Sequence, residues 1–363
     1  MVGLLIAATL LLAFANGAND NFKGFATVWG SGSLSYRKAL IAATSATIAG
    51  SAVSLLLAQE LVRRFSGKGL VPDAVAADPS FITSAAFGAA ATVMVATRVG
   101  MPISTTHALL GGLIGAGAMV DGEGIDLAVL ASSFVLPLLL SPILAAGLGL
   151  AIYLFVRSRR AAIDCACLAG TESAVTAGGP ALRPASLLPR MILAPQAECA
   201  DLPPSTLRMS VPLLMDRVHI LSATSICFAR SVNDTPKLAA LLVAASATGL
   251  QVSVGIVALT MALGGLLLSR RVAETMSLKI NRMDAVQGVS ANLITAALVL
   301  LASRFGLPLS TTQVSVGSIA GVGAGARTLD ASALRSVLGP DAAAVRDDQS
   351  GRRRGAAMRE QRS

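Results

Sequence analysis

The sequence predicts an all-α polytopic membrane protein: an inverted-topology repeat of two helical halves, with broken or re-entrant helices at its centre. Three observations predict this fold. Hydrophobic residues make up 54% of the 363 residues and charged residues 13%, against roughly 45–50% and about 25% in soluble domains. Several apolar stretches reach the roughly 20 residues that cross a bilayer. Finally, two short polar motifs each occur twice, in the same order along the chain.

The apolar windows divide the chain into two halves. Residues 1–156 form a first transmembrane repeat, with windows at roughly 3–28, 38–58, 80–98, 105–120 and 127–156. Residues 157–210 are rich in Pro, Gly, Ser and Arg without a sustained apolar run, which predicts a loosely ordered linker. Residues 211–327 form a second repeat, with windows at roughly 211–245, 248–268, 284–303 and 307–325. Residues 328–363 are a polar, basic tail, so no counterpart of the fifth window is visible and the last helix of the second repeat is apparently missing.

The charge distribution predicts the orientation in the membrane. The net charge is +9, but the basic residues lie between apolar spans and at the chain end, without the aromatic interleaving of a nucleic-acid surface. Under the positive-inside rule, the linker and the C-terminal tail are expected on the cytoplasmic side and the N-terminus outside. Five spans in the first half then make the second half start from the opposite side, which gives an inverted repeat in the cell inner (plasma) membrane.

The Ser-Thr-Thr motif predicts an anion site. It occurs after a Gly-x-Pro break in both halves, at Ser104, Thr105, Thr106, Ser310, Thr311 and Thr312. Proline disfavours helix for the residue before it, so a helix can begin just afterwards with Ser and Thr in its cap and first turn. The free N–H groups and the dipole of such a start attract an anion. Two starts meeting head-on would enclose one small tetrahedral oxyanion, and since neither motif contains Arg, neutral donors are expected to hold it.

The second motif predicts a cation site. It places amide and carboxylate oxygens within apolar windows, at Asn19, Asp20, Asn233 and Asp234. These oxygens suit a small hard cation such as sodium, and the carboxylates alternatively suit a proton. The basic residues Lys23, Arg230 and Lys237 flank the motif and could instead pair with the carboxylates.

Taken together, the motifs resemble those of the PiT family of inorganic phosphate transporters. The resemblance rests on Gly-Ala-Asn-Asp-Asn-Phe-Lys-Gly at 17–24, Pro-Ile-Ser-Thr-Thr-His at 102–107, and their second-half forms at 230–237 and 308–312. It covers roughly residues 10–325 and implies phosphate uptake by a secondary transporter, coupled to sodium or protons through alternating access. It also implies anion binding by the Ser-Thr-Thr residues, cation binding by the Asn-Asp residues, and a homodimer as the candidate assembly.

Other functions remain open on sequence grounds. A sulfate or other oxyanion permease would use the same neutral donors, and an inactive or regulatory remnant would explain the missing span. An enzyme is not expected, because a catalytic constellation needs one asymmetric site whereas this pattern is nearly symmetric. The expected partners are inorganic phosphate, sodium or protons, and the lipid bilayer, with no nucleic acid and no cofactor beyond the coupling ion.

Overall fold

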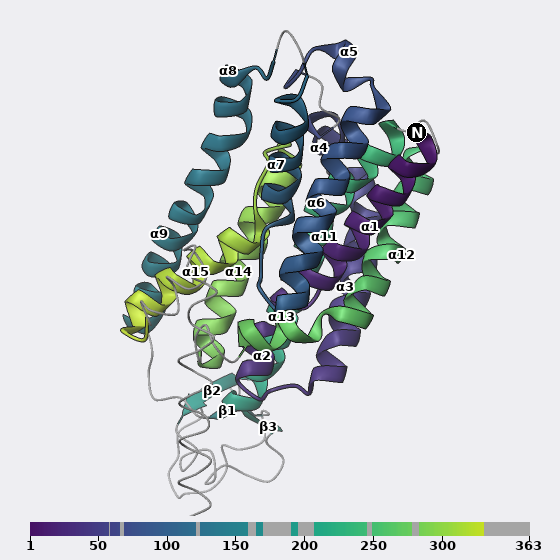
Figure 1. Cartoon of the computed structure of the whole chain (residues 1–363). Helices are drawn as coiled ribbons and strands as arrows, with labels where there is room; N and C mark the ends of the chain where they lie inside the picture. The colour runs from purple at the N-terminus through teal and green to yellow at the C-terminus, as the bar shows by residue number, and fades with distance from the viewer. Residues whose placement is uncertain are drawn as a thin grey trace, which may run out of the picture.

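The chain folds into a bundle of long helices with a small sheet at one end (Figure 1). The computed structural model describes residues 1–57, 59–65, 69–120, 124–158, 165–169, 190–194, 207–244, 249–277 and 283–329. Within these ranges, six helices are long and apolar enough to cross a membrane. The all-α polytopic fold expected from the sequence is confirmed.

The first half opens with a broken helix. α1 (Val2–Asp20) ends within the first Asn-Asp motif, and the chain continues through the short helices η1 (Lys23–Phe25) and α2 (Ala26–Gly30). The remaining helices of this half are α3 (Tyr36–Leu57), α4 (Gln59–Arg64), α5 (Asp73–Ala76), α6 (Pro79–Val99), α7 (Thr105–Gly117), α8 (Leu127–Val129), η2 (Leu130–Val135) and α9 (Leu136–Ser158). α7 has only 13 residues, too few to cross a bilayer, as expected of a re-entrant segment.

The second half repeats the order of the long helices as far as the re-entrant helix, and no described helix after it corresponds to α9. Its elements are α11 (Val211–Ala244), α12 (Leu250–Leu268), α13 (Arg270–Thr275), α14 (Ala285–Arg304) and α15 (Thr311–Ala326). α11 corresponds to α1 but continues through Pro236 as one 34-residue helix.

A three-stranded sheet is formed by the segment that connects the two halves in the chain, which was expected to be a loosely ordered linker. β1 (Cys165–Ala169) pairs antiparallel with β2 (Arg190–Ala194) and with β3 (Leu207–Ser210), in the order β2-β1-β3. The strands have only four or five residues. Strands this short leave no sustained apolar run in the sequence, so they are not predictable from the apolar windows.

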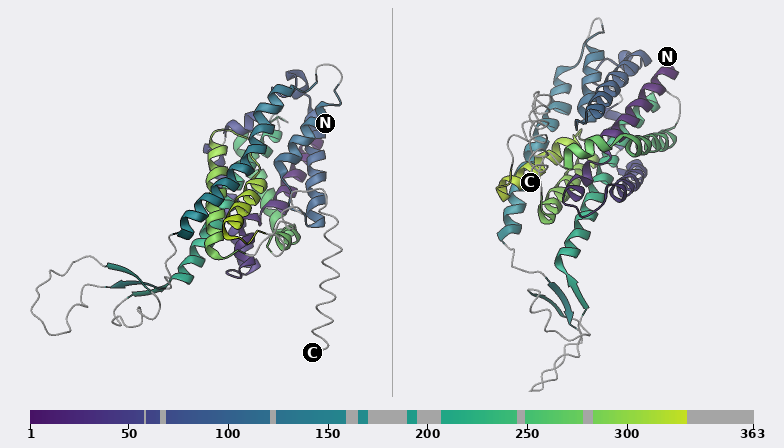
Figure 2. Two further views of the ribbon diagram at one scale, coloured as in Figure 1. Left: turned by 90° about the vertical axis from the view of Figure 1, so that its left-hand side faces the viewer. Right: turned by 60° about the horizontal axis from the view of Figure 1, so that its bottom comes forward.

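Helix packing follows a pseudo-twofold relation between the halves. Within each half, the first helix packs against the third, as α1 on α6 and α11 on α14. Between halves, the first helix of one packs against the second helix of the other, as α1 on α12 and α11 on α3. α6 and α7 form a pair, as do α14 and α15. This packing brings the two copies of each motif together inside the bundle. The long helices run side by side in both further views, with the strands at one end (Figure 2).

α9 breaks the symmetry, because it packs along α15 and no described helix covers α7 in the same way. On α15, β-carbons added at Gly317 or Gly321 would collide with the carbonyl oxygens of Pro142 or Ala146 on α9. At the matched glycines of α7, such as Gly115, no described atom lies within 4 Å of an added β-carbon. The first half therefore leaves one face of its re-entrant helix open.

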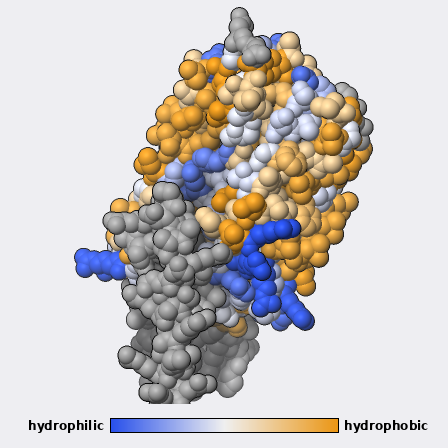
Figure 3. Space-filling model, viewed as in Figure 1, coloured by the Kyte–Doolittle hydropathy of each residue, from blue (hydrophilic) through white to orange (hydrophobic). Residues whose placement is uncertain are grey.

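The outer surface fits a lipid environment. Apolar side chains cover most of the helical body in the view of Figure 3, and hydrophilic residues gather toward the end that bears α2 and α13. Exposed leucines are frequent on α9 and α12, including Leu139, Leu154 and Leu267. Large exposed apolar surfaces of this kind are rare on soluble monomers and expected where lipid is the solvent.

Candidate functional site

Both Ser-Thr-Thr runs start a short helix after a chain break. Just after the preceding helices α6 and α14 end, Gly100 and Gly306 have φ values of 76° and 65°. Glycine adopts this left-handed backbone without the steric cost of a β-carbon. Ser104 then caps α7, and Ser310 caps α15; each hydroxyl accepts from the N–H three residues on at 3.2 Å. The predicted helix starts are thus present in both halves with the same geometry.

The two starts adjoin each other at the centre of the bundle. The hydroxyl of Thr106 donates to the carbonyl oxygen of Leu309 at 3.2 Å, just before the second run. Reciprocally, the hydroxyl of Thr312 donates to the carbonyl oxygen of Ile103 at 3.1 Å, just before the first run. Each run therefore contacts the loop that precedes the other, as two inverted copies meeting at one point would.

The asparagines of the Asn-Asp motifs hold these loops in place. Asn19 Nδ2 donates to Thr97 Oγ1 at 2.9 Å, and its Oδ1 accepts from the N–H of Ile103 at 3.1 Å. Asn233 Oδ1 accepts from the hydroxyl of Ser303, the residue that matches Thr97, at 3.3 Å. Both amide oxygens already accept a hydrogen bond here, so the asparagines position the re-entrant segments.

The two carboxylates of the motifs share one donor. Asn16 Nδ2 lies 3.2 Å from an oxygen of Asp20 and 3.2 Å from an oxygen of Asp234. The hydroxyl of Thr105 also donates to Asp20, at 3.1 Å. The two aspartates lie 214 positions apart in the chain, on α1 and α11, and both are buried. The Asn-Asp and Ser-Thr-Thr motifs, which sequence analysis treated as separate cation and anion sites, therefore form one cluster.

Two lysines complete the cluster with matching contacts. Lys23 forms a short ion pair with Asp20 and donates to the carbonyl oxygen of Ile103 at 2.5 Å and to the hydroxyl of Thr312 at 2.7 Å. Both side chains of the ion pair are almost completely buried. The ammonium group thus has three oxygen neighbours, two of them from the regions that form the helix starts.

The second lysine repeats this arrangement in the other half. Lys237 Nζ lies 3.3 Å from Asp234 Oδ1, 3.1 Å from the carbonyl oxygen of Leu309 and 2.7 Å from the hydroxyl of Thr106. Leu309 holds the same position before its motif as Ile103 does before the first. Each lysine therefore reaches its own half through a carbonyl and the opposite half through a threonine.

Arg230 is the third buried cation of the cluster, with 1% of its surface exposed. It occupies the position in α11 that Asn16 occupies in α1, and the two meet, Arg230 Nη1 donating to Asn16 Oδ1 at 3.0 Å. A second bond joins Nη2 to Thr47 at 2.8 Å, and Nη1 lies 3.9 Å from Asp234. Its Nε has no hydrogen-bond partner among the described residues.

The cluster corrects one expectation from sequence. The Ser-Thr-Thr hydroxyls were expected to bind an anion as neutral donors only, yet three cationic side chains lie among them, against two carboxylates. The predicted ion pairs of Lys23, Arg230 and Lys237 with the carboxylates are present. Asn16 was missed altogether. The role of the lysines in this cluster could have been predicted from the sequence. Each lysine follows its Asp by three residues, and the two lysines are separated by the same 214 positions as the two Asn-Asp motifs.

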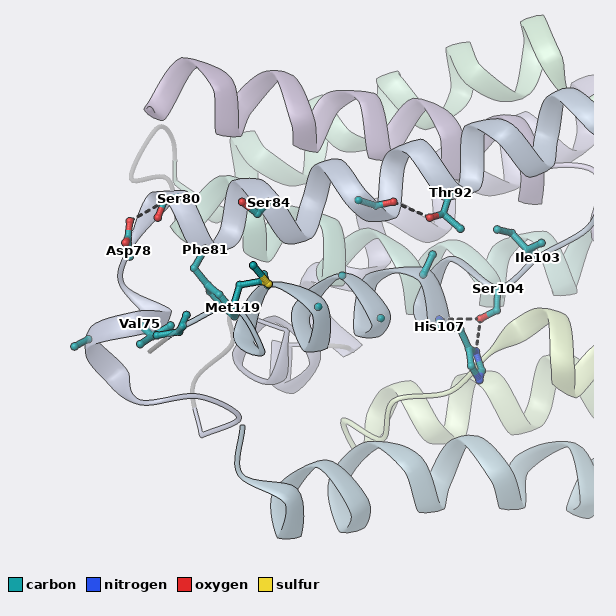
Figure 4. Close-up of a pocket in the computed structure, with 18 residues that line it drawn as sticks. Val75, Asp78, Ser80, Phe81, Ser84, Thr92, Ile103, Ser104, His107 and Met119 are labelled. Atoms are coloured by element: carbon teal, nitrogen blue, oxygen red, sulfur yellow. Dashed lines mark hydrogen bonds between the residues drawn. The ribbon is translucent and has the colours of Figure 1, made fainter. Parts of the chain in front are cut away.

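The space around the cluster is unevenly distributed. A cavity of about 10 Å³ lies between Asn16, Thr105, Asp234 and Lys237, enough for at most one water molecule. A much larger open pocket of about 1000 Å³ runs along the uncovered face of α7. It extends from Asp78 and Ser80 at the start of α6 to Ser104 and His107 at the start of α7 (Figure 4).

The inner end of this pocket is polar. His107 Nδ1 and the hydroxyl of Ser104 lie 2.8 Å apart, and both face the pocket. Thr106 and Thr312 lie deeper, at the lysines. The pocket therefore ends against the buried cluster, since the carbonyl oxygen of its lining residue Ile103 accepts from Lys23 and Thr312. No group of three or more His, Cys, Asp or Glu side chains with metal-site geometry occurs among the residues that the structure describes.

Comparison with known proteins identifies the family. A sequence profile of the phosphate transporter family matches residues 16–342, which includes all four motifs. The chain belongs to this phosphate transporter family. A Pyrococcus abyssi protein that carries the provisional name phosphate permease is 25% identical over 383 aligned positions, covering 92% of both chains. A protein of the same provisional name from Thermococcus kodakarensis is 27% identical, covering 90% of both.

The transporter fold is shared with a solved structure described as the sodium-dependent phosphate transporter. The TM-score is 0.69, with 19% sequence identity and 93% of each chain covered. At this identity the likeness establishes the fold alone. This phosphate transporter family member therefore shares its fold with that solved structure and has a central cluster in which its two repeats meet.

Proposed function

We propose that this chain takes up inorganic phosphate across a membrane by alternating access, coupled to sodium ions or protons. The observation that carries the proposal is the meeting of the two capped helix starts beside two buried lysines. Helix N-termini and ammonium groups both attract oxyanions. Family membership adds support, since relatives are named for phosphate transport.

Phosphate would bind between the two helix starts. The first-turn N–H groups of a helix have no partner within it, and the helix dipole adds positive potential there. Hydroxyl donors would come from both halves, at Ser104, Thr105, Thr106, Ser310, Thr311 and Thr312. The hydrogen bonds that Thr106 and Thr312 now make to opposite carbonyls would be exchanged for bonds to phosphate oxygens. An anion held by both repeats at once is released when the repeats move apart.

Cation coupling would act through the carboxylates in the same cluster. The cation-binding residues would be Asn19, Asp20, Asn233 and Asp234, with sodium or a proton as the coupling ion. At neutral pH phosphate still carries a proton, which a neighbouring carboxylate can accept, whereas sulfate offers none. Because both carboxylates share the donor Asn16, a change at one affects the other.

Access would alternate between the two faces of the membrane. The pocket along α7 reaches Ser104 from one end of the bundle, while the central cavity is far too small for a phosphate ion. Rocking of one repeat against the other would open the cluster to each side in turn, as in other inverted-repeat transporters. We place the protein in the cell inner membrane. Under the positive-inside rule the N-terminus lies outside and the α7 pocket opens outward, whereas residues 157–210 and 328–363 lie in the cytoplasm.

Uptake of labelled phosphate into proteoliposomes under separately imposed sodium and proton gradients tests the proposal. Asp20→Asn and Asp234→Asn are each expected to abolish gradient-driven accumulation, because each removes one of the two central carboxylates. Asp73→Asn, an exposed carboxylate on α5 outside the pocket lining, is the matched control and should retain it. Accumulation that survives in both central variants would contradict the proposal, and stronger competition by sulfate than by unlabelled phosphate would assign another oxyanion as substrate.

A further inference from the structure

The two lysines of the cluster have surroundings typical of bound metal cations. Each ammonium group is enclosed by a carboxylate oxygen, a backbone carbonyl oxygen and a threonine hydroxyl. Carboxylate, carbonyl and hydroxyl oxygens form the ligand set that small hard cations prefer. The two sets are related by the repeat, so the protein contains a symmetric pair of cation positions, and each is filled by a lysine of its own chain.

We propose that the ammonium groups of Lys23 and Lys237 occupy the places that sodium ions would take in a sodium-dependent transporter, so that this chain binds phosphate without sodium. The inference rests on the proposed function and decides between the two coupling ions left open there. It concerns the sodium requirement suggested by the name of the solved relative.

The cluster as it stands does not fit an added sodium ion. One oxygen of Asp20 accepts from Lys23, and the other accepts from Asn16 and Thr105. One oxygen of Asp234 accepts from Lys237, and the other accepts from Asn16. All four carboxylate oxygens therefore have donors, and the central cavity of about 10 Å³ leaves space for one water molecule at most. A sodium ion would have to displace a lysine.

The charge of the cluster also indicates that phosphate can bind without sodium. A buried anion is stable only when positive charge accompanies it. Here the lysines and Arg230 exceed the two carboxylates by one positive charge, which balances one monovalent phosphate without any mobile ion. If the lysines were replaced by neutral residues, the cluster would carry a net negative charge, and anion binding would then require added cations.

Thermal unfolding of the purified protein tests the inference without transport. Wild-type protein in sodium chloride and in potassium chloride of equal concentration should have the same Tm, because no sodium binds. The double variant Lys23→Asn, Lys237→Asn leaves space and an amide oxygen at each position, so its Tm should rise with sodium but not with potassium. Lys23→Met, Lys237→Met removes the charges while filling the space and should show no sodium response. Lys38→Asn, at an exposed lysine of α3, is the control for surface charge.

Phosphate uptake then separates the two proposals. Wild-type uptake should change by less than about twofold when potassium replaces sodium, whereas the double Asn variant should lose about tenfold or more without sodium, a change of about 1.4 kcal/mol in binding. A sodium-specific rise of the wild-type Tm, or wild-type uptake that requires sodium, would overturn the inference and leave phosphate transport standing. A folded double Asn variant without any sodium response would overturn it as well. Absence of phosphate uptake under every gradient, with the Tm pattern as expected, would refute the proposed function alone.

Discussion

The ion pair between Asp20 and Lys23 gives the sharpest prediction about the energetics of the cluster. Both side chains are nearly inaccessible to solvent, and breaking a buried pair by removing one partner costs about 3–5 kcal/mol because the other charge is left uncompensated. Asp20→Asn is expected to reach this range, since it raises the excess of positive charge in the cluster. Lys23→Met should cost less, because it leaves two cations beside two carboxylates.

The double variant distinguishes this account from simple loss of packing. With Asp20→Asn and Lys23→Met combined, no unpaired charge remains from this pair, so the free energy of unfolding should recover by about 1–3 kcal/mol relative to the sum of the single changes. Equilibrium unfolding in mixed micelles measures all three variants. The exposed pair of Arg270 and Glu274, at 3.0 Å with side chains 74% and 44% exposed, is the control and should couple by less than about 1 kcal/mol. If the central variants are additive within about 0.5 kcal/mol, the reasoning is refuted.

Three further predictions concern the helix starts and the repeat. Ser310→Ala removes the cap of α15 and should lower the free energy of unfolding by about 0.5–2 kcal/mol, which the same micelle titration measures. Gly321→Ala forces α15 away from α9 and should lower the free energy of unfolding by about 1–3 kcal/mol. The matched Gly115→Ala on α7 meets open space and should not lower it measurably. Equal losses of unfolding free energy in the two variants would argue against the asymmetry between the repeats. Thr106→Val and Thr312→Val each leave a buried ammonium short of one acceptor and should each weaken phosphate binding, with about 1–3 kcal/mol lost per site; a loss confined to one of them would contradict the symmetric role.

Most of the fold followed from the sequence because lipid imposes simple rules on it. The nine apolar windows each correspond to a helix or to a run of successive helices, and the Gly-x-Pro breaks correctly located the starts of α7 and α15. A proline inside an apolar window does not by itself mark a helix end, since α11 continues through Pro236. The sheet of β1, β2 and β3 escaped detection, because its strands are short and lie in a polar segment.

The polar cluster was less accessible to sequence reasoning than the fold. Pattern and spacing identified the repeated Asn-Asp and Ser-Thr-Thr residues, but treated them as separate cation and anion sites. Only the packing of one half against the other brings Asn16 of α1 to Asp234 of α11, and Lys237 of α11 to Thr106 of α7. Contacts between residues more than a hundred positions apart depend on how helices pack, and no local pattern encodes them.

The central claim is that two inverted copies form one phosphate site, and the stoichiometry of phosphate binding tests it most directly. Labelled phosphate bound to the purified protein should saturate at one ion per chain, and Thr106→Val and Thr312→Val should each weaken that same single site. Two ions per chain, with each substitution abolishing one of them, would contradict the account.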